Sequence, residues 1–272
     1  MMIERKYLGQ EKALKRVLSE LFPEVGYSEI SACARRRDIM VDGVRTSLDA
    51  VIKSGSVVTI YPKNKREIKV IYEDDNLLAC YKPKGIASEG EVSFYTLVVA
   101  AKGNVRLMHR LDTNTDGVLL FAKNDVAYRE LYDAMKSGSI RKEYLAEVYG
   151  VPQEIGEVSL DYYYKKDIEH GRAIISDLPK EGFVPVHLSF IVRERKSESA
   201  VLHVVIHKGK THQIRAMLAH YGHFILGDGK YGSDKVNRML GVTKTRLTAC
   251  AVEFAFPKGS TLSYLNAIRI SI

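Results

Sequence analysis

Residues 62–69 form a polar and basic stretch that separates two parts of the chain with different hydrophobic patterns. A stretch of this composition is typical of a linker. The chain has 272 residues, and at roughly 150 residues per domain this length also predicts about two domains. We therefore expect a first domain at residues 1–61, a linker at 62–69 and a second domain at 70–272.

The first part has the pattern of two short helices followed by a hairpin. The first helix is indicated by apolar residues with the spacing of one helix face: Leu14, Val17, Leu18 and Leu21. We expect Ser28 to cap a second helix, which ends in a run of three arginines: Arg35, Arg36 and Arg37. The pair Asp42-Gly43 between apolar runs predicts a tight hairpin, and residues 57–61 predict a closing strand.

This order of elements resembles the alpha-L RNA-binding module, the small domain first seen in a ribosomal small-subunit protein, over about residues 10–61. The resemblance implies that Arg35, Arg36 and Arg37 belong to a basic surface that binds RNA; the alternative is a solvated helix face. Residues 1–69 hold 14 Lys and Arg against 9 Asp and Glu, so +5 of the net charge of +8 lies in the first quarter. A positive surface attracts the phosphates of a nucleic acid.

The overall composition restricts the class of protein. Apolar residues make up 46% and charged residues 27%, as in ordinary globular proteins. The three cysteines, Cys33, Cys80 and Cys250, form no CxxC pair, which argues against a disulfide framework and a thiolate zinc site. The longest uncharged apolar run, residues 92–101, is shorter than the ~20 residues that a membrane helix needs. With no secretory signal at the start, we expect a cytoplasmic protein without a membrane partner.

The second part contains strand-like and helical patterns that do not alternate regularly. The strand-like runs are residues 70–72, 77–81, 118–122, 144–149, 201–206 and 252–256, and the helical ones are 126–135 and 212–220. This irregular order favours an α+β fold over a doubly wound parallel sheet. The run Tyr162-Tyr163-Tyr164 before two lysines is open to two interpretations, an aromatic and basic RNA-binding patch or a half-exposed strand.

The polar turn from His109 to Gly117, followed by an apolar run, contains the residues best suited to chemistry. A rigid strand after such a turn can aim an acidic side chain, here Asp112, into a cleft. An aspartate in a turn more commonly bonds to its own backbone, so the turn alone leaves both interpretations open.

The stretch resembles the active-site signature of the RluA-type pseudouridine synthases: His-Arg-Leu-Asp, two variable residues, Thr-Ser-Gly, four apolar positions and Ala-Lys. Further blocks match that family in the same order at residues 74–85, 141–146, 209–215 and 222–232. The chain departs from the family at Asp116, where Ser is usual, at Phe224, where Pro is usual, and at Cys250, where His is more common.

The resemblance implies an α+β catalytic domain with a mixed, mainly antiparallel sheet, which isomerises uridine to pseudouridine in RNA without a cofactor. Asp112 matches the catalytic aspartate, Arg215 an arginine that pairs with it, and Tyr144 a tyrosine that stacks on the target base. A neighbouring guanidinium favours the ionised aspartate. Whether Asp112 attacks the ribose, attacks the base or supports an elimination stays open.

A base inside a helix cannot be reached, so the target uridine must leave the stack. The resemblance implies that Arg110 fills the space left by the base, or else contacts a phosphate, and that His109 organises the loop. The expected substrate-binding set is completed by three further residues: Leu111, Thr115 and Lys82.

Metal chemistry is less well supported by the sequence. Five histidines (His203, His207, His212, His220 and His223) lack a Cys or HExxH pattern, and an Asp112–Asp116 magnesium pair lacks a third carboxylate. We therefore expect no metal, and a monomer that acts on ribosomal RNA of the large subunit. Transfer RNA as substrate, and a non-catalytic RNA-binding or ribosome assembly factor on the same fold, are the alternatives.

Overall fold

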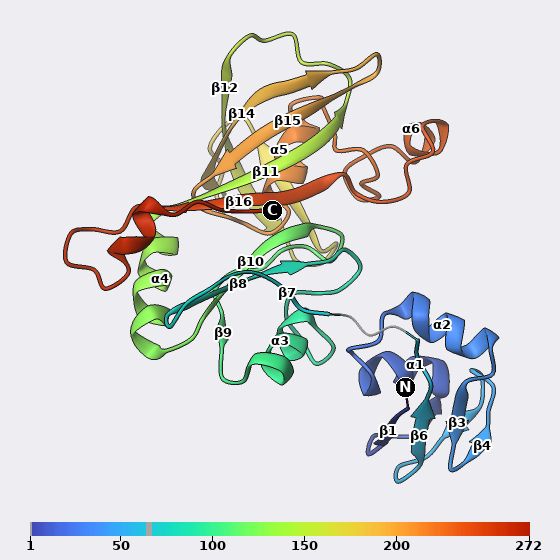
Figure 1. The fold of residues 1–272 in the computed structure, drawn as a ribbon. Coiled ribbons are helices and arrows are strands. Elements are labelled where there is room, and N and C mark those ends of the chain that lie inside the picture. The colour runs from blue at the N-terminus through green and yellow to red at the C-terminus, as the bar shows by residue number, and fades with distance from the viewer. Residues whose placement is uncertain (1, 64–66) are drawn as a thin grey trace. The chain divides into compact units, whose positions relative to one another are not determined.

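The computed structural model describes residues 2–63 and 67–272, and the chain divides into two compact units (Figure 1). The first unit comprises Met1–Ile68 and Glu89–Gly103, and the second comprises Lys69–Ser88 and Asn104–Ile272. Residues 64–66 of the linker expected at 62–69 lie outside the described residues. The linker and the domain boundaries at 61 and 70 therefore stay predictions.

The first unit holds a four-stranded antiparallel sheet, a two-stranded ribbon and three helices. Its strands are β1 (Ile3–Lys6), β2 (Lys12–Ala13), β3 (Ile39–Val41), β4 (Val44–Arg45), β5 (Val51–Ile52) and β6 (Val57–Ile60), and its helices are α1 (Leu14–Leu21), α2 (Tyr27–Arg35) and α3 (Phe94–Lys102). The expected first helix and closing strand are confirmed by α1 and β6. Leu14, Val17 and Leu18 are fully buried in the core of the unit, as their spacing predicts.

The hairpin between β3 and β4 is confirmed, because Asp42 and Gly43 both have positive φ, at 50° and 79°, as a tight primed turn requires. The expected cap of the second helix is wrong. Gly26 is the extended residue before α2, and Ser28 lies inside the first turn.

The three arginines at the end of α2 do not share one environment. Arg35 and Arg37 are exposed, whereas Arg36 is half-buried. Its guanidinium pairs with Glu29 at 2.9 Å and with Asp38 at 2.7 Å. The expectation that all three side chains present basic surface is corrected at Arg36, because its hydrogen bonds are made within the unit.

The second unit is built on one large sheet with the main strand order β13-β12-β14-β15-β11-β16-β10-β8-β7. Its strands are β7 (Lys69–Glu73), β8 (Leu77–Lys82), β9 (Arg106–Leu107), β10 (Asp116–Ala122), β11 (Ile140–Tyr149), β12 (Glu157–Asp167), β13 (Arg172–Ser176), β14 (Val184–Arg195), β15 (Ser199–Ile206), β16 (Leu247–Phe254) and β17 (Ile270–Ser271). Only the β10–β16 pair is parallel among the described pairings of this sheet. The α+β fold with a mainly antiparallel sheet is confirmed.

All six expected strand runs and both helical runs of this part overlap observed elements, although the run 252–256 continues two residues past β16 and the run 212–220 begins one residue before α5. The helices are α4 (Asp125–Ser137), α5 (Gln213–His220) and α6 (Asp234–Met239), with a 3-10 turn η1 (Ser263–Ala267). The three tyrosines at 162–164 lie in β12, which settles their secondary structure as a strand. Strand β14 and helix α3 were not expected from the sequence.

Apolar residues of β8 and β10 pack against α4, and they form one core cluster of the unit between this helix and the sheet (Figure 1). Gly117 stands at the parallel contact of β10 with β16 and has a φ of 120°. A Cβ atom there would lie 2.0 Å from the carbonyl oxygen of Ala249, so only glycine fits. This close contact fixes where the polar turn before β10 meets the sheet. None of the described helices combines the length and apolar character needed to cross a bilayer.

Candidate active site

The polar turn that carries Asp112 connects β9 to β10. It is held by a hydrogen bond within the turn and by two hydrogen bonds with Ser88. The Thr115 backbone N–H donates to the Asp112 carbonyl at 3.0 Å. The Ser88 hydroxyl accepts from the Leu111 N–H at 2.9 Å and donates to the Leu111 carbonyl at 2.7 Å. Because Leu111 and Thr115 are also buried, the backbone around Asp112 is fixed before any substrate arrives.

Lys82 at the end of β8 is one of the groups that hold this turn. Its side chain is completely buried, and Nζ donates to the carbonyls of Pro83 at 3.0 Å, Ile86 at 2.8 Å and Thr113 at 3.4 Å. It does not line the cavity described below. The expectation of a direct substrate contact is therefore corrected: the ammonium joins two loops because its protons are used by backbone oxygens.

Asp112 pairs with Arg215 of α5. The distance from Arg215 Nη1 to Asp112 Oδ2 is 2.8 Å, and the Arg215 side chain is 12% exposed. The other edge of the guanidinium bonds twice to Asp228, with Nε–Oδ2 at 2.7 Å and Nη2–Oδ1 at 2.8 Å. One guanidinium thus joins two carboxylates, one buried and one facing the cavity.

Asp228 was not predicted as a site residue, although it lies in the matched block at 222–232. It is fully buried and also accepts from the backbone N–H groups of Lys230 and Tyr231. Burial raises the pKa of Asp228, but the hydrogen bonds and charge of Arg215 outweigh this and lower it overall. Burial likewise lowers the pKa of Arg215, and Asp228 and Asp112 raise it overall. Arg215 therefore stays cationic beside Asp112.

His212 precedes α5 in the left-handed conformation, with a φ of 57°. A non-glycine residue adopts this conformation when its surroundings hold it there. Tyr231 Oη accepts from the Ala173 N–H at 2.6 Å and shares a 3.0 Å hydrogen bond with His212 Nδ1. His212 Nε2 lies 3.9 Å from Asp112 Oδ1. Burial lowers the pKa of His212, which favours the neutral ring beside Asp112.

Tyr144 lies on β11, is 6% exposed and lines the cavity with Asp112 and Arg215. Burial and the Asp112 charge both raise the pKa of the Tyr144 phenol, which therefore keeps its proton. An aromatic ring fixed on a rigid strand gives an apolar face on which a base can stack.

His109 contributes to the loop through its ring. Its Nε2 accepts from the Leu120 N–H at 3.3 Å. Burial and the positive charge of Lys142 lower the pKa of His109 to about 3, so the ring is neutral. Arg110, the next residue, is exposed and also lines the cavity.

These groups surround a cavity of about 320 Å³ in the second unit. Its walls include all three predicted catalytic residues: Asp112, Tyr144 and Arg215. They also include four of the five predicted substrate-binding residues: His109, Arg110, Leu111 and Thr115. The cavity is of the size class that holds a small ligand or one nucleotide unit.

Two departures from the family pattern have structural contacts. Asp116 accepts from the hydroxyls of Tyr81 and Thr248, each at 2.7 Å, and joins β8, β10 and β16 rather than pairing with Asp112. Phe224 stacks on Tyr149 with ring centroids 5.2 Å apart. Neither residue lines the cavity.

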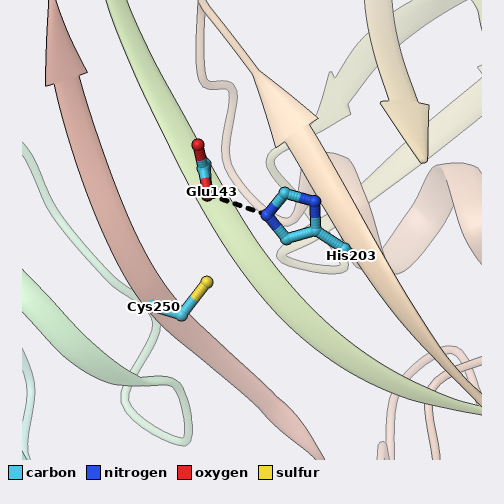
Figure 2. Close-up of side chains that lie close together, drawn as sticks. All are labelled: Glu143, His203 and Cys250. Atoms are coloured by element: carbon cyan, nitrogen blue, oxygen red, sulfur yellow. Dashed lines mark hydrogen bonds and ion pairs between the residues drawn. The ribbon is translucent and has the colours of Figure 1, made fainter. Parts of the chain in front are cut away.

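The third departure, Cys250, lies in the one three-residue cluster among the described residues whose ligand atoms approach closely enough for a metal (Figure 2). His203 donates to Glu143 Oε2 at 2.8 Å, and Arg269 donates to the same oxygen at 2.7 Å. Arg141 bonds to Oε1. Two guanidinium groups and engaged carboxylate oxygens oppose a bound cation, so this cluster acts as an anchor across β11, β15 and β16.

The chain is similar in sequence to RNA pseudouridine synthases. Residues 76–220 match the family model described as RNA pseudouridylate synthase, and this range includes Asp112, Tyr144 and Arg215. Ribosomal large subunit pseudouridine synthase C of Haemophilus influenzae is 30% identical over 265 residues, which are 87% of this chain and 82% of that protein. Its counterpart in Buchnera aphidicola is 27% identical, over 96% of this chain and 92% of that protein.

A solved structure, human RNA pseudouridylate synthase domain containing 1, has the same fold with a TM-score of 0.64 at 20% identity. It matches 78% of this chain and 86% of its own. The matched family range spans more than half of the 272 residues. Together with the relatives, it shows that the chain belongs to the RNA pseudouridylate synthase family.

Proposed function

We propose that this chain isomerises uridine to pseudouridine in large-subunit ribosomal RNA, with Asp112 as the acting carboxylate. The single observation that supports the site is the 2.8 Å pair between Asp112 Oδ2 and Arg215 Nη1 in the wall of the cavity. The guanidinium orients the carboxylate and places a positive charge beside it in the wall of the cavity.

The reaction breaks the bond between N1 of uracil and C1′ of ribose and forms a bond between C5 and C1′. The C5 proton leaves and N1 gains a proton, so no atom or electron is gained or lost overall. A carboxylate can carry the sugar or the base between these steps as a covalent nucleophile. Asp112 can also support an elimination, and the contacts of its two oxygens are compatible with each route.

Binding requires the uridine to be flipped out of the RNA stack. Tyr144 offers the stacking face, Leu111 and Thr115 complete the wall, and His109 keeps the loop in place. Arg110 is exposed at the cavity, where its guanidinium can occupy the vacated space or bind a phosphate.

Ribosomal RNA is proposed as substrate because the matched bacterial relatives are named ribosomal large subunit pseudouridine synthases. We further propose that residues 1–61 bind RNA through Arg35 and Arg37, whose side chains are exposed. Monomeric action in the cytoplasm completes the proposal, and the mass of the purified protein in solution tests the oligomeric state.

Mapping pseudouridines in cellular RNA with and without the gene tests this function. We expect at least one large-subunit position to lose pseudouridine and to regain it with the wild-type gene but not with Asp112→Asn. A change confined to transfer RNA would replace the substrate, and an unchanged map would favour a non-catalytic RNA-binding factor.

A further inference from the structure

Lys142 on β11 is a largely buried cation to which the proposed reaction assigns no role. Its residue exposure is 6%, and its side chain lines the cavity. Within residues 2–63 and 67–272, no hydrogen bond or ion pair joins its ammonium to a side chain or carbonyl, and the nitrogen is open to the cavity. Lys82 is 0% exposed and has three carbonyl partners, so the two lysines differ in what satisfies the charge.

Keeping the Lys142 ammonium protonated in this largely buried position costs free energy. Burial lowers the pKa of Lys142 to about 8, and no partner raises it again. Its neighbour His109 is neutral and cannot supply a negative charge. Proteins pair buried charges or satisfy them with a ligand, and unsatisfied ones concentrate at functional sites. The geometry therefore indicates that the partner of Lys142 is a group that enters the cavity.

The position of Lys142 shows which part of a nucleotide it can meet. Lys142 pairs with Ile206 and Tyr144 with Val204 in the regular register of β11 with β15. Residues two apart on a strand point to the same face and lie about 7 Å apart. A base stacked on Tyr144 thus has its edge within reach of the Lys142 ammonium.

Two other cationic side chains line the cavity closer to solvent, where they are better placed than Lys142 to meet the RNA phosphates. Arg110 and Lys210 also line the cavity but are exposed, where a phosphate that remains on the RNA backbone can reach them. A negative charge that forms deep in the cavity, on the base itself, is the better match for a cation that is 6% exposed.

We propose that the Lys142 ammonium donates a hydrogen bond to a carbonyl oxygen of the flipped uracil and stabilises the negative charge of the detached base. This inference rests on the proposed function. When the N1–C1′ bond breaks, its electron pair stays with uracil and spreads onto the ring oxygens. The pair is used again when C5 bonds to C1′, and Lys142 keeps its proton throughout. A preorganised donor of this kind acts on the transition state more than on binding.

The test compares Lys142→Met and Lys142→Gln with Lys258→Met, which removes an exposed lysine outside the cavity. Three quantities are measured on the full chain: the rate of pseudouridine formation at saturating RNA, the Kd for RNA at several salt concentrations, and the Tm. We expect Lys142→Met to slow the reaction about 10²–10³-fold, with its Kd within twofold of wild type. Lys142→Gln should be intermediate because a neutral donor forms a weaker hydrogen bond.

Stability separates this role from a structural one. Replacing the ammonium of this largely buried lysine, which lacks a counter-charge, with an apolar side chain of similar length should keep or raise the Tm while activity falls. Lys258→Met should match wild type in all three measurements.

Three results would overturn the proposal: a Lys142→Met rate near that of wild type, a lost rate with a lowered Tm, or an unchanged rate with weaker binding and a shallower salt dependence. The last would identify a phosphate contact. If wild type itself forms no pseudouridine in ribosomal RNA, the proposed function fails. If wild type does and Lys142→Met forms it at a similar rate, only this inference fails.

Discussion

The two faces of β11 carry the same kind of ion pair and use it differently. On one face, Glu143 is 2% exposed and its carboxylate is bonded to Arg141, His203 and Arg269. On the cavity face, the Asp112 carboxylate is 20% exposed and bonded to one guanidinium nitrogen, with the His212 ring 3.9 Å from its other oxygen. A fully bonded carboxylate stabilises a fold, whereas one with a free oxygen beside a cavity can react.

The largest expected effect comes from neutralising the open carboxylate. Asp112→Asn should reduce pseudouridine formation by about 10⁴-fold or more, since a nucleophile cannot be replaced by its neighbours. RNA binding should persist within a few-fold, as measured by Kd at fixed salt. If Asp112→Asn converts uridine at a rate comparable to wild type, Asp112 takes no part in the reaction. The distinction drawn between the two faces of β11 would then also be wrong.

Asp228→Asn should have the next largest effect because it weakens the partner that orients Arg215. We expect activity to fall about 10–100-fold, the range for groups that orient a reacting one. The free energy of unfolding should fall by about 3 kcal/mol, since the buried Arg215 guanidinium loses one of two counter-charges. Denaturant unfolding and single-turnover rates measure the two effects. An active Asp228→Asn variant would show that Asp112 alone positions the arginine.

Glu143→Gln should lower the free energy of unfolding but keep the activity per folded molecule within twofold of wild type. Because Arg141 and Arg269 are 38% and 49% exposed, solvent screens their charges, and we expect a loss of about 1–3 kcal/mol. A large fall in the rate with no change in unfolding would contradict the anchor role.

The pH dependence of stability gives a second measure of this anchor. Burial raises the pKa of Glu143, but the hydrogen bonds of Arg269 and His203 and the charge of Arg141 lower it below its ordinary value of 4.5. A lowered folded-state pKa adds stability that is present above 4.5 and is lost as pH falls through the folded-state value. The difference in Tm between wild type and Glu143→Gln should therefore narrow below pH 4.5, and a constant difference would argue against it.

The matched sequence blocks predicted the residues that meet at the cavity better than the groups that hold them. Asp112, Tyr144 and Arg215 come from three separate blocks and meet at one cavity, as expected. Lys82 was misassigned because its motif indicates a loop at the site but not whether the amine faces substrate or backbone carbonyls. Asp228 and His212 lie in matched blocks too, yet their contacts with Arg215 and Tyr231 depend on distant segments meeting in space.

The prediction of strands has the same limit, because local patterns identify apolar core strands but not strands that depend on long-range pairing. Core strands such as β10 are continuous apolar runs, and their sequences predict them. Strand β14 begins with Val-Pro-Val-His and ends in Arg-Glu-Arg, so its apolar part is short and bounded by polar residues. It forms because β12 and β15 pair with it on both sides, which is a long-range effect that no local pattern contains.

The arginines at the end of α2 extend the comparison to the first unit and give the smallest expected effect. Arg36 is bonded to Glu29 and Asp38, as Glu143 is bonded to its partners, whereas Arg35 and Arg37 are exposed. The double variant Arg35→Met, Arg37→Met should weaken RNA binding a few-fold and reduce the slope of log Kd against log salt by about 1–2, because fewer counterions are released. Arg36→Met should leave the slope unchanged and lower the Tm, since Glu29 and Asp38 lose their partner. Equal slopes for wild type and the double variant would mean that exposed arginines at this position do not touch RNA, and that openness to solvent alone does not identify a binding residue.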